Sequence, residues 1–203
     1  MAVKDHSLDD KIIESATAEF LEFGFQGASL RRIAQRANLS TGALYTRYES
    51  KDALFCSIVQ DILSEISHEF EPLRQGYMEA QKSSNVEDVL EAMRREESVY
   101  QNILLKYHDQ CVLFFCQSDG SSLQAKLERL MAYKAKETVA FLEQISQKEV
   151  DAIGVEMLLS EQFYCYRAIL QKRLSREKTA ACLKTVERFH EAGWRELFRQ
   201  IMK

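Results

Sequence analysis

Apolar residues recur at steps of three and four positions along most of the chain, the spacing that places them on one face of an α-helix. The first such stripe predicts an N-terminal helix that ends at the turn from Gly24 to Gly27. Its members are Leu8, Ile12, Ala16, Phe20 and Phe23. Amphipathic helices of this kind cover one another with their apolar faces, so the pattern predicts a helical core.

Two short helices separated by a sharp turn are predicted next. Ser29 is placed to cap the first of them. Its buried face comprises Leu30, Ile33, Ala34 and Ala37. Asn38 follows, and asparagine tolerates the left-handed conformation that a sharp turn needs. Ser40 is placed to cap the second short helix, which directs Leu44 and Tyr48 inward.

Longer helices follow to the C-terminus. Ser50 caps one that runs from Lys51 toward Glu71, and we expect Pro72 to end it because proline cannot continue a helix. A polar loop is expected over 81–85. Further helices are predicted at about 86–107, around 111–116, at 123–147 and 150–172, and from the cap Ser175 to the C-terminus. The predicted fold class is all-α.

Composition supports this class and limits the function. One proline and seven glycines in 203 residues are too few for a many-turned β fold or a disordered chain. The net charge is −4, from 27 basic and 31 acidic residues, yet the segment from Gln26 to Lys51 carries a local excess of positive charge. Its basic residues are Arg31, Arg32, Arg36, Arg47 and Lys51, and its one acid is Glu49. A local basic patch is typical of a small nucleic-acid-binding unit, although a solvated helix face has the same charge pattern.

The two short helices have the pattern of a helix-turn-helix motif. A recognition helix enters the major groove with its N-terminal end, so its first residues need to be small, and Thr41, Gly42 and Ala43 are small. The free N–H groups and the positive dipole end of that helix face phosphate. Donors that can reach phosphates or base edges flank this end: Arg31, Tyr45, Arg47 and Lys51.

These residues, in this order and spacing, resemble the N-terminal domain of TetR-family transcriptional regulators. The resemblance extends from Gly24-Phe25 through Leu54. It is carried by Ser29-Leu30-Arg31-Arg32-Ile33-Ala34, Ala37, Leu39-Ser40-Thr41-Gly42-Ala43-Leu44-Tyr45, Tyr48 and Lys51. The resemblance implies a homodimer whose two heads read a pseudo-palindromic operator in double-stranded DNA. It also implies a repressor that a small-molecule effector releases from the operator by binding the C-terminal domain.

The resemblance assigns roles to individual residues. Arg31 is similar to a base reader, and Thr41, Gly42 and Tyr45 are similar to the first-turn contacts of the recognition helix, beside the small Ala43. The residues that resemble phosphate anchors are Ser29, Arg47 and Lys51. Arg32 and Arg36 we interpret as surface residues rather than specific readers. Three positions depart from the family: Asn38 replaces a common glycine, Tyr48 a phenylalanine and Arg47 a frequent histidine.

We predict a helix-turn-helix domain over 1–50, a connecting helix over 51–71 and a helical effector-binding and dimerisation domain over 72–203. Candidate effector-binding residues are Tyr100, Tyr107, His108, Cys111, Phe115, Phe163 and Tyr166. They suit an apolar or aromatic molecule that carries a hydrogen-bonding group. The same spacing is also that of ordinary helix core, and this alternative stays open.

The last predicted helix carries a further apolar stripe that we expect at a dimer interface, together with a face of the preceding helix near Met157, Tyr164 and Ile169. The members of the stripe are Leu183, Val186, His190, Gly193 and Leu197. A glycine inside a helix costs about 1 kcal/mol relative to alanine, and close approach of another helix is a reason to retain Gly193. The alternative is that this helix only completes the core of the monomer.

The remaining alternatives are weaker. No phosphate-binding glycine loop or nucleophile motif supports an enzyme. His108 and Cys111 supply two ligands where a structural zinc needs four, so no metal or cofactor is predicted. Five cysteines without a C-x-x-C pair favour reduced thiols in the cytoplasm, with no membrane partner. A thiol-switched regulator of the same fold and a helical protein-interaction module without DNA binding remain as alternative interpretations.

Overall fold

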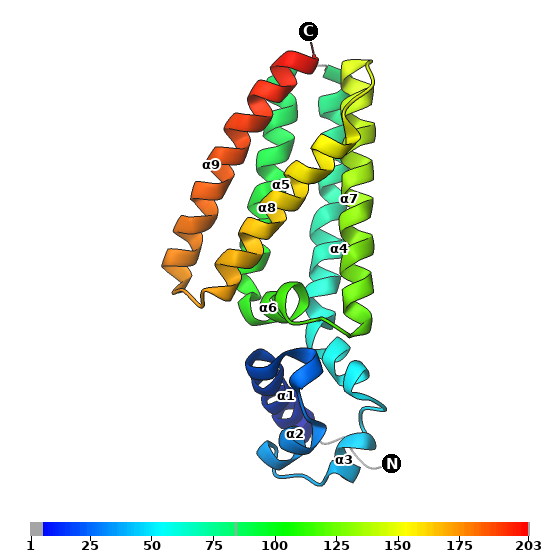
Figure 1. Cartoon of the computed structure of the whole chain (residues 1–203), viewed down its shortest axis with the longest axis vertical. Coiled ribbons are helices and arrows are strands. Elements are labelled where there is room, and N and C mark those ends of the chain that lie inside the picture. The colour runs from blue at the N-terminus through cyan, green and yellow to red at the C-terminus, as the bar shows by residue number, and fades with distance from the viewer. Residues whose placement is uncertain (1–5, 84, 203) are drawn as a thin grey trace. The chain divides into compact units, whose positions relative to one another are not determined.

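The computed structural model describes residues 6–83 and 85–202, and within them the chain forms nine α-helices and no strand (Figure 1). The all-α prediction is confirmed. The helices are α1 (His6–Gly27), α2 (Leu30–Arg36), α3 (Thr41–Tyr45), α4 (Lys51–Ser83), α5 (Val86–Lys106), α6 (His108–Cys116), α7 (Ser122–Ser146), α8 (Ala152–Gln171) and α9 (Arg176–Ile201). None of the described helices combines the length and apolar character that a membrane span requires.

These helices form two compact units. The first comprises the described residues up to Leu63 together with Asp109–Leu127, and the second comprises Ser64–His108 and the described residues from Glu128 onward. Helix α4 therefore contributes its first part to one unit and its second part to the other. Most of α6 and the start of α7 belong to the first unit although they follow α5 in the chain.

An aromatic cluster holds the first unit together. Phe20 and Phe25 of α1 and Phe55 of α4 contact one another, with ring centroids 4.8 Å apart for Phe20 and Phe55 and 5.2 Å apart for Phe25 and Phe55. Phe20 and Phe55 are fully buried. Such pairs contribute about 0.5–1.5 kcal/mol each beyond the burial of their surface, so this cluster fixes α1 to the start of α4.

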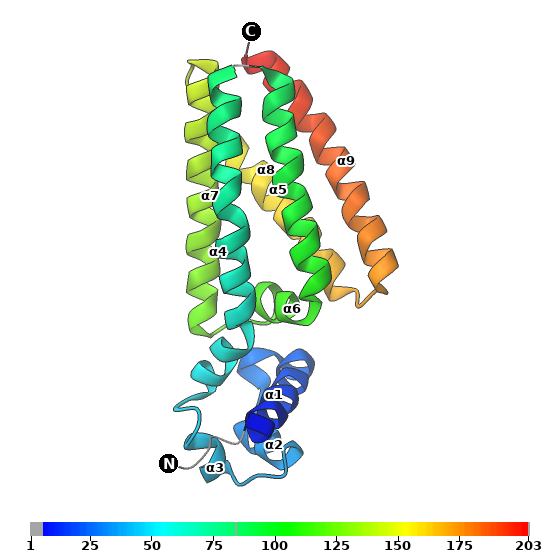
Figure 2. The same ribbon diagram turned by 180° about the vertical axis from the view of Figure 1, so that it is seen from behind.

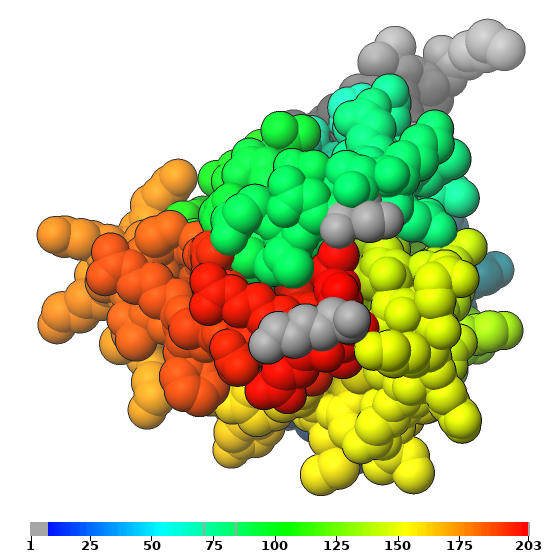
Figure 3. Space-filling model, turned by 90° about the horizontal axis from the view of Figure 1, so that it is seen from above, coloured from blue at the N-terminus to red at the C-terminus, as the bar shows by residue number. Residues whose placement is uncertain are grey.

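The second unit is a bundle of α5, α7, α8, α9 and the later part of α4, seen from the opposite side in Figure 2. Its core contains Trp194 and Phe198 of α9, whose stacked rings lie 5.8 Å apart. Other buried members come from α5, α7 and α4 and include Val89, Leu90, Leu142 and Ala80. Figure 3 looks onto the end of this bundle, where the end of α9 in red lies beside the start of α5 in green and the α7–α8 turn in yellow.

The expectation that Pro72 ends the fourth helix is wrong, because α4 continues through it to Ser83. A proline inside a helix removes one backbone hydrogen bond and costs about 3 kcal/mol. The residues beyond it offset this cost by packing: Ala80 is buried in the core of the second unit, and Tyr77 packs against the same core. The loop expected over 81–85 shrinks accordingly, and Asn85 caps α5 by accepting a hydrogen bond from the Glu87 N–H at 3.0 Å.

Candidate nucleic-acid interface

The first of the two short helices is held at its start by a buried acid. Ser29 has the extended conformation of a cap residue, but its side chain makes no capping hydrogen bond. Its N–H instead donates to Glu19 Oε1 of α1 at 3.0 Å. Glu19 is fully buried, and the sequence reasoning above missed it. Its position three residues after Ala16 and next to Phe20 places it beside the apolar face, which is the signal that could have revealed it.

Two arginines of α2 also converge on Glu19. Arg32 Nε donates to Glu19 Oε1 at 2.6 Å and Arg32 Nη2 donates to the Gly27 carbonyl at 2.8 Å. Arg36 pairs with Glu22 at 2.9 Å and lies 3.8 Å from Glu19. These contacts fasten α2 to α1. The same contacts neutralise much of the charge of Arg32 and Arg36. A polyanion would therefore have to be bound by the other basic residues of this segment.

The turn between α2 and α3 follows the predicted chemistry. Asn38 has a φ of 57°, the left-handed conformation that asparagine tolerates. Ser40 then caps α3, because its Oγ accepts a hydrogen bond from the Ala43 N–H at 3.1 Å. Leu44 is buried with 1% of its surface exposed, so it anchors α3 against the core of the first unit. The anchored face leaves the opposite face of α3 to solvent.

That opposite face carries the predicted first-turn contacts. Tyr45 is 52% exposed, Gly42 is exposed, and Thr41 and Ala43 are half-buried. A Cβ added at Gly42 would meet only Ser40 Oγ, at 3.8 Å. The backbone at the start of α3 is therefore open to close approach from outside the chain.

The basic residues predicted to contact DNA differ in whether their side chains already have partners within the chain. Arg31 is exposed, and among the described residues no hydrogen bond or ion pair engages its side chain. Arg47 is half-buried, with Nε 3.0 Å from Asp9 Oδ1. Lys51 donates to the carbonyls of Gln26 at 3.3 Å and Ala28 at 3.2 Å, and its ammonium lies over the Phe25 ring. Lys51 thus also closes the end of α1, a structural role that the sequence did not indicate.

Residues 12–58 match the family model described as "Bacterial regulatory proteins, tetR family". Over this segment the chain is similar to the DNA-binding domain of TetR-family regulators. YhgD of Bacillus subtilis, named an uncharacterized HTH-type transcriptional regulator, is 36% identical over 62 residues, which cover 30% of this chain and 32% of that protein. Rv1474c of Mycobacterium tuberculosis, named an HTH-type transcriptional repressor, is 33% identical over 51 residues, covering 25% of this chain and 27% of that protein. The matched region thus spans about a third or less of the curated relatives.

Solved structures are similar over nearly the whole chain. A TetR-like transcriptional regulator from Rhodococcus sp. RHA1 has a TM-score of 0.62 at 16% identity, covering 95% of this chain and 100% of that one. The fatty acid degradation regulator FadR from Bacillus halodurans has a TM-score of 0.57 at 17% identity, covering 91% and 98%. PfmR from Thermus thermophilus has a TM-score of 0.53 at 20% identity, covering 87% and 97%. At these identities the likeness establishes the fold alone.

The predicted effector-binding residues fall in both units. Tyr100 and Tyr166 come together in the second unit, with ring centroids 6.4 Å apart. Tyr107, His108 and Phe163 also belong to the second unit, whereas Cys111 and Phe115 belong to the first. The structure therefore brings two of the seven into a ring contact and divides the set between two cores.

A polar centre that the sequence reasoning missed surrounds the two tyrosines. Tyr166 donates its hydroxyl to Glu97 at 2.6 Å, and Gln162 donates to the same carboxylate at 3.1 Å. The neighbouring Glu96 accepts from Tyr77 and pairs with Lys134. Both acids are 8% exposed. Burial raises the pKa of Glu97 and raises the pKa of Tyr166 far above its ordinary value.

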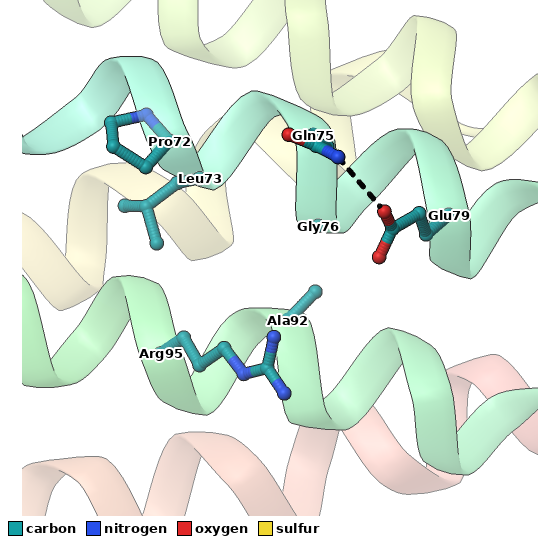
Figure 4. A pocket seen from close by; sticks show the side chains of 7 residues that line it. All are labelled: Pro72, Leu73, Gln75, Gly76, Glu79, Ala92 and Arg95. Atoms are coloured by element: carbon teal, nitrogen blue, oxygen red, sulfur yellow. Dashed lines mark hydrogen bonds between the residues drawn. The ribbon is translucent and has the colours of Figure 1, made fainter.

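A small hollow lies between α4 and α5 in the second unit (Figure 4). Its volume is about 240 Å³, below the 300–1,000 Å³ typical of ligand sites. It is lined by Pro72, Leu73, Gln75, Gly76, Glu79, Ala92 and Arg95. Gln75 donates to Glu79 at 3.1 Å, and Arg95 pairs with Glu91 at 3.2 Å. None of the predicted aromatic residues lines this hollow.

The residues predicted for a dimer interface on α9 are buried to different extents within the chain. Leu183 and His190 are 1% and 7% exposed, so they already pack against their own unit. Val186 and Leu197 are half-buried, and Gly193 is exposed with no atom within 4 Å of an added Cβ. Several large apolar side chains on α8 and α9 are exposed, among them Met157 and Tyr164 of the predicted surface: Ile153, Met157, Leu158, Tyr164 and Phe189.

The cysteines form no disulfide bond among the described residues. Burial raises the pKa of the Cys56, Cys111 and Cys165 thiols. A raised pKa keeps a thiol protonated and less reactive at neutral pH, which disfavours a thiol switch at these three positions.

Proposed function

We propose that the chain is a DNA-binding transcriptional regulator that inserts the N-terminal end of α3 into the major groove. The observation that carries this proposal is the open face of α3, where Gly42 leaves the backbone accessible and Tyr45 stands exposed. Arg31 of α2, free of partners among the described residues, supplies a donor that can read a base edge. Thr41 and the free N–H groups of α3 then face phosphate.

The regulator is proposed to be a repressor. Its relative Rv1474c is named a transcriptional repressor, and this supports the assignment over the matched helix-turn-helix region. Phosphate contacts are assigned to Ser29, which precedes α2, to Arg47, which follows the end of α3, and to Lys51, which begins α4. Because Arg47 and Lys51 also make contacts within the chain, they hold the motif in shape as well as contacting DNA.

The active form is proposed to be a homodimer that reads a pseudo-palindromic operator. The exposed side chains of Tyr164 on α8 and Phe189 on α9, 71% and 73% exposed, support a partner that covers parts of these two helices. A second copy related by twofold symmetry covers such a face and presents two reading heads. These heads fit half-sites about 34 Å apart, one turn of DNA.

A small-molecule effector is proposed to act on the second unit. Tyr100, Tyr166 and the buried Glu97 support an apolar or aromatic molecule that offers a hydrogen-bond donor. In the first unit, Asp52 of α4 accepts hydrogen bonds from the Ser122 N–H at 2.8 Å and the Ser122 hydroxyl at 2.7 Å. A shift of α7 can therefore act on the start of α4, next to the DNA-binding helices, in addition to any tilt of α4 itself.

Selection of duplexes from a random pool by the full chain tests this function. We expect enrichment of a pseudo-palindromic sequence, and we expect its affinity to fall steeply between low and moderate salt because phosphate contacts release counterions. A pool that stays unenriched, or binding that is indifferent to salt, contradicts the proposal and favours a helical module that binds protein.

A further inference from the structure

Three metal-ligating side chains meet where α8 and α9 pack together in the second unit. Glu161 and Cys165 are four residues apart on α8, a spacing that puts them on one helix face. His190 projects toward them from α9. One ligand atom from each of the three residues lies within 4.8 Å of the others.

The distances between these atoms fit the first coordination shell of zinc. His190 Nε2 lies 3.3 Å from Glu161 Oε2, and Cys165 Sγ lies 3.5 Å from Glu161 Oε1. In a tetrahedral zinc site, metal–ligand bonds of about 2.1 Å to nitrogen and oxygen and about 2.3 Å to sulfur separate the ligands by about 3.4–3.6 Å. These two contacts use different oxygens of the Glu161 carboxylate; with one ligand atom taken from each residue, all separations are within 4.8 Å. The side chains therefore need to approach by about 1.2 Å at most to reach the separations of a bound ion.

His190 supplies an independent sign that this place lacks a ligand. The residue is 7% exposed, and its Nε2 has no hydrogen-bond partner although a carboxylate oxygen lies 3.3 Å away. A buried polar atom without a partner is costly, and a cation between the imidazole and the carboxylate satisfies both.

We infer that Glu161, Cys165 and His190 form a binding site for a transition-metal ion of the zinc class. Nitrogen and thiolate ligands favour Zn²⁺ over Mg²⁺ or Ca²⁺, which prefer oxygen alone. The Cys165 thiol loses its proton to solvent when the metal binds, and the thiolate becomes the ligand. Three protein ligands leave a fourth position for water on the side of Glu161, whose side chain is 52% exposed. The site joins α8 to α9 and does not depend on the proposed function.

Titration of the chelator-treated full chain with Co²⁺ and Zn²⁺ tests the inference. We expect one Co²⁺ per chain, with the visible spectrum of tetrahedral cobalt and a near-ultraviolet thiolate-to-cobalt band, and we expect Zn²⁺ to displace it. Cys165→Ser should abolish the thiolate band and weaken Zn²⁺ binding at least tenfold. Cys182→Ser is the matched control, a half-buried cysteine on α9 outside the trio, and it should leave both unchanged.

His190→Gln provides a second test. It replaces the imidazole ligand by a neutral amide side chain of similar size. Its circular dichroism spectrum should match that of the native chain, while Zn²⁺ affinity falls at least tenfold. His68→Gln, a change at an 84% exposed side chain, should have no effect. The inference is overturned if the native chain binds no stoichiometric metal, or if Cys165→Ser and Cys182→Ser bind Co²⁺ with the same spectrum.

Discussion

Replacing Glu19 by alanine should loosen the DNA-binding helices without unfolding the rest of the chain. Glu19 is the acceptor for the Ser29 N–H at the start of α2 and the ion-pair partner of Arg32. Both contacts disappear in Glu19→Ala, and the N–H is left without an acceptor. Glu19→Gln is the matched control, because it keeps the volume and an oxygen that can accept the same N–H.

The free energy lost in Glu19→Ala can be estimated from the two contacts. An N–H left without its charged acceptor costs about 2 kcal/mol. The Arg32 contact adds only about 0.5 kcal/mol, since 45% of that side chain is exposed and water can solvate its charge. The sum of about 2.5 kcal/mol corresponds to roughly a 70-fold change in an opening equilibrium. Glu19→Gln should cost less than about 1 kcal/mol.

Amide hydrogen exchange of the full chain measures this change segment by segment. We expect peptides from α2 and α3 to lose roughly 70-fold in protection in Glu19→Ala, while peptides around Trp194 in the second unit keep theirs. Unchanged protection in α2, or an equal loss in Glu19→Gln, refutes the view that the buried carboxylate positions the motif.

Three further predictions follow from the same structure. In a binding assay, Arg31→Ala should lower affinity for the selected operator by about 1–3 kcal/mol and relax the base preference. Lys51→Ala should weaken binding to all duplexes alike and also lower the melting temperature of the chain. Identical behaviour of the two variants contradicts the division into base reader and phosphate anchor. Gly193→Leu should stabilise the helix by roughly 0.5–1 kcal/mol and shift sedimentation toward monomer, and an intact dimer would place the interface elsewhere. Burial raises the pKa of Glu97, so the folded chain holds this proton more tightly than the unfolded one and the carboxyl lowers stability as pH rises above about 4.3. The stability of Glu97→Gln relative to the native chain should therefore increase as pH rises above about 4.3. Unfolding followed by Trp194 fluorescence measures this difference, and a difference that does not change with pH argues against a raised pKa.

Local signals in the sequence were sufficient to predict the DNA-binding motif. The Ser40 cap and the left-handed Asn38 depend on a few neighbouring residues, and the structure has both as predicted. Leu44 was likewise identified as core from its spacing alone. Short-range backbone chemistry of this kind can be read directly from residue types.

Features that depend on distant residues could not be predicted in the same way. Pro72 has a strong local preference to end a helix, but the packing of Tyr77 and Ala80 outweighs it. Glu97 lies on α5, and its role depends on the hydrogen bond that it accepts from Tyr166 on another helix. His190 was expected to face a partner subunit, and its closeness to α8 depends on how the two helices cross.

The central claim is that the start of α3 approaches DNA closely, and Gly42→Gln tests it most directly. The new side chain meets only Ser40 Oγ at 3.8 Å, so the chain should keep or raise its melting temperature. The same side chain holds α3 away from base edges, whose contacts contribute about 1–3 kcal/mol each. We predict that affinity for the selected duplex, measured by fluorescence anisotropy, falls by about 100-fold or more, equivalent to two such contacts. Gly76→Gln, the same change at an open position of α4, should bind as the native chain does. A folded Gly42→Gln variant that binds the duplex with native affinity contradicts the account.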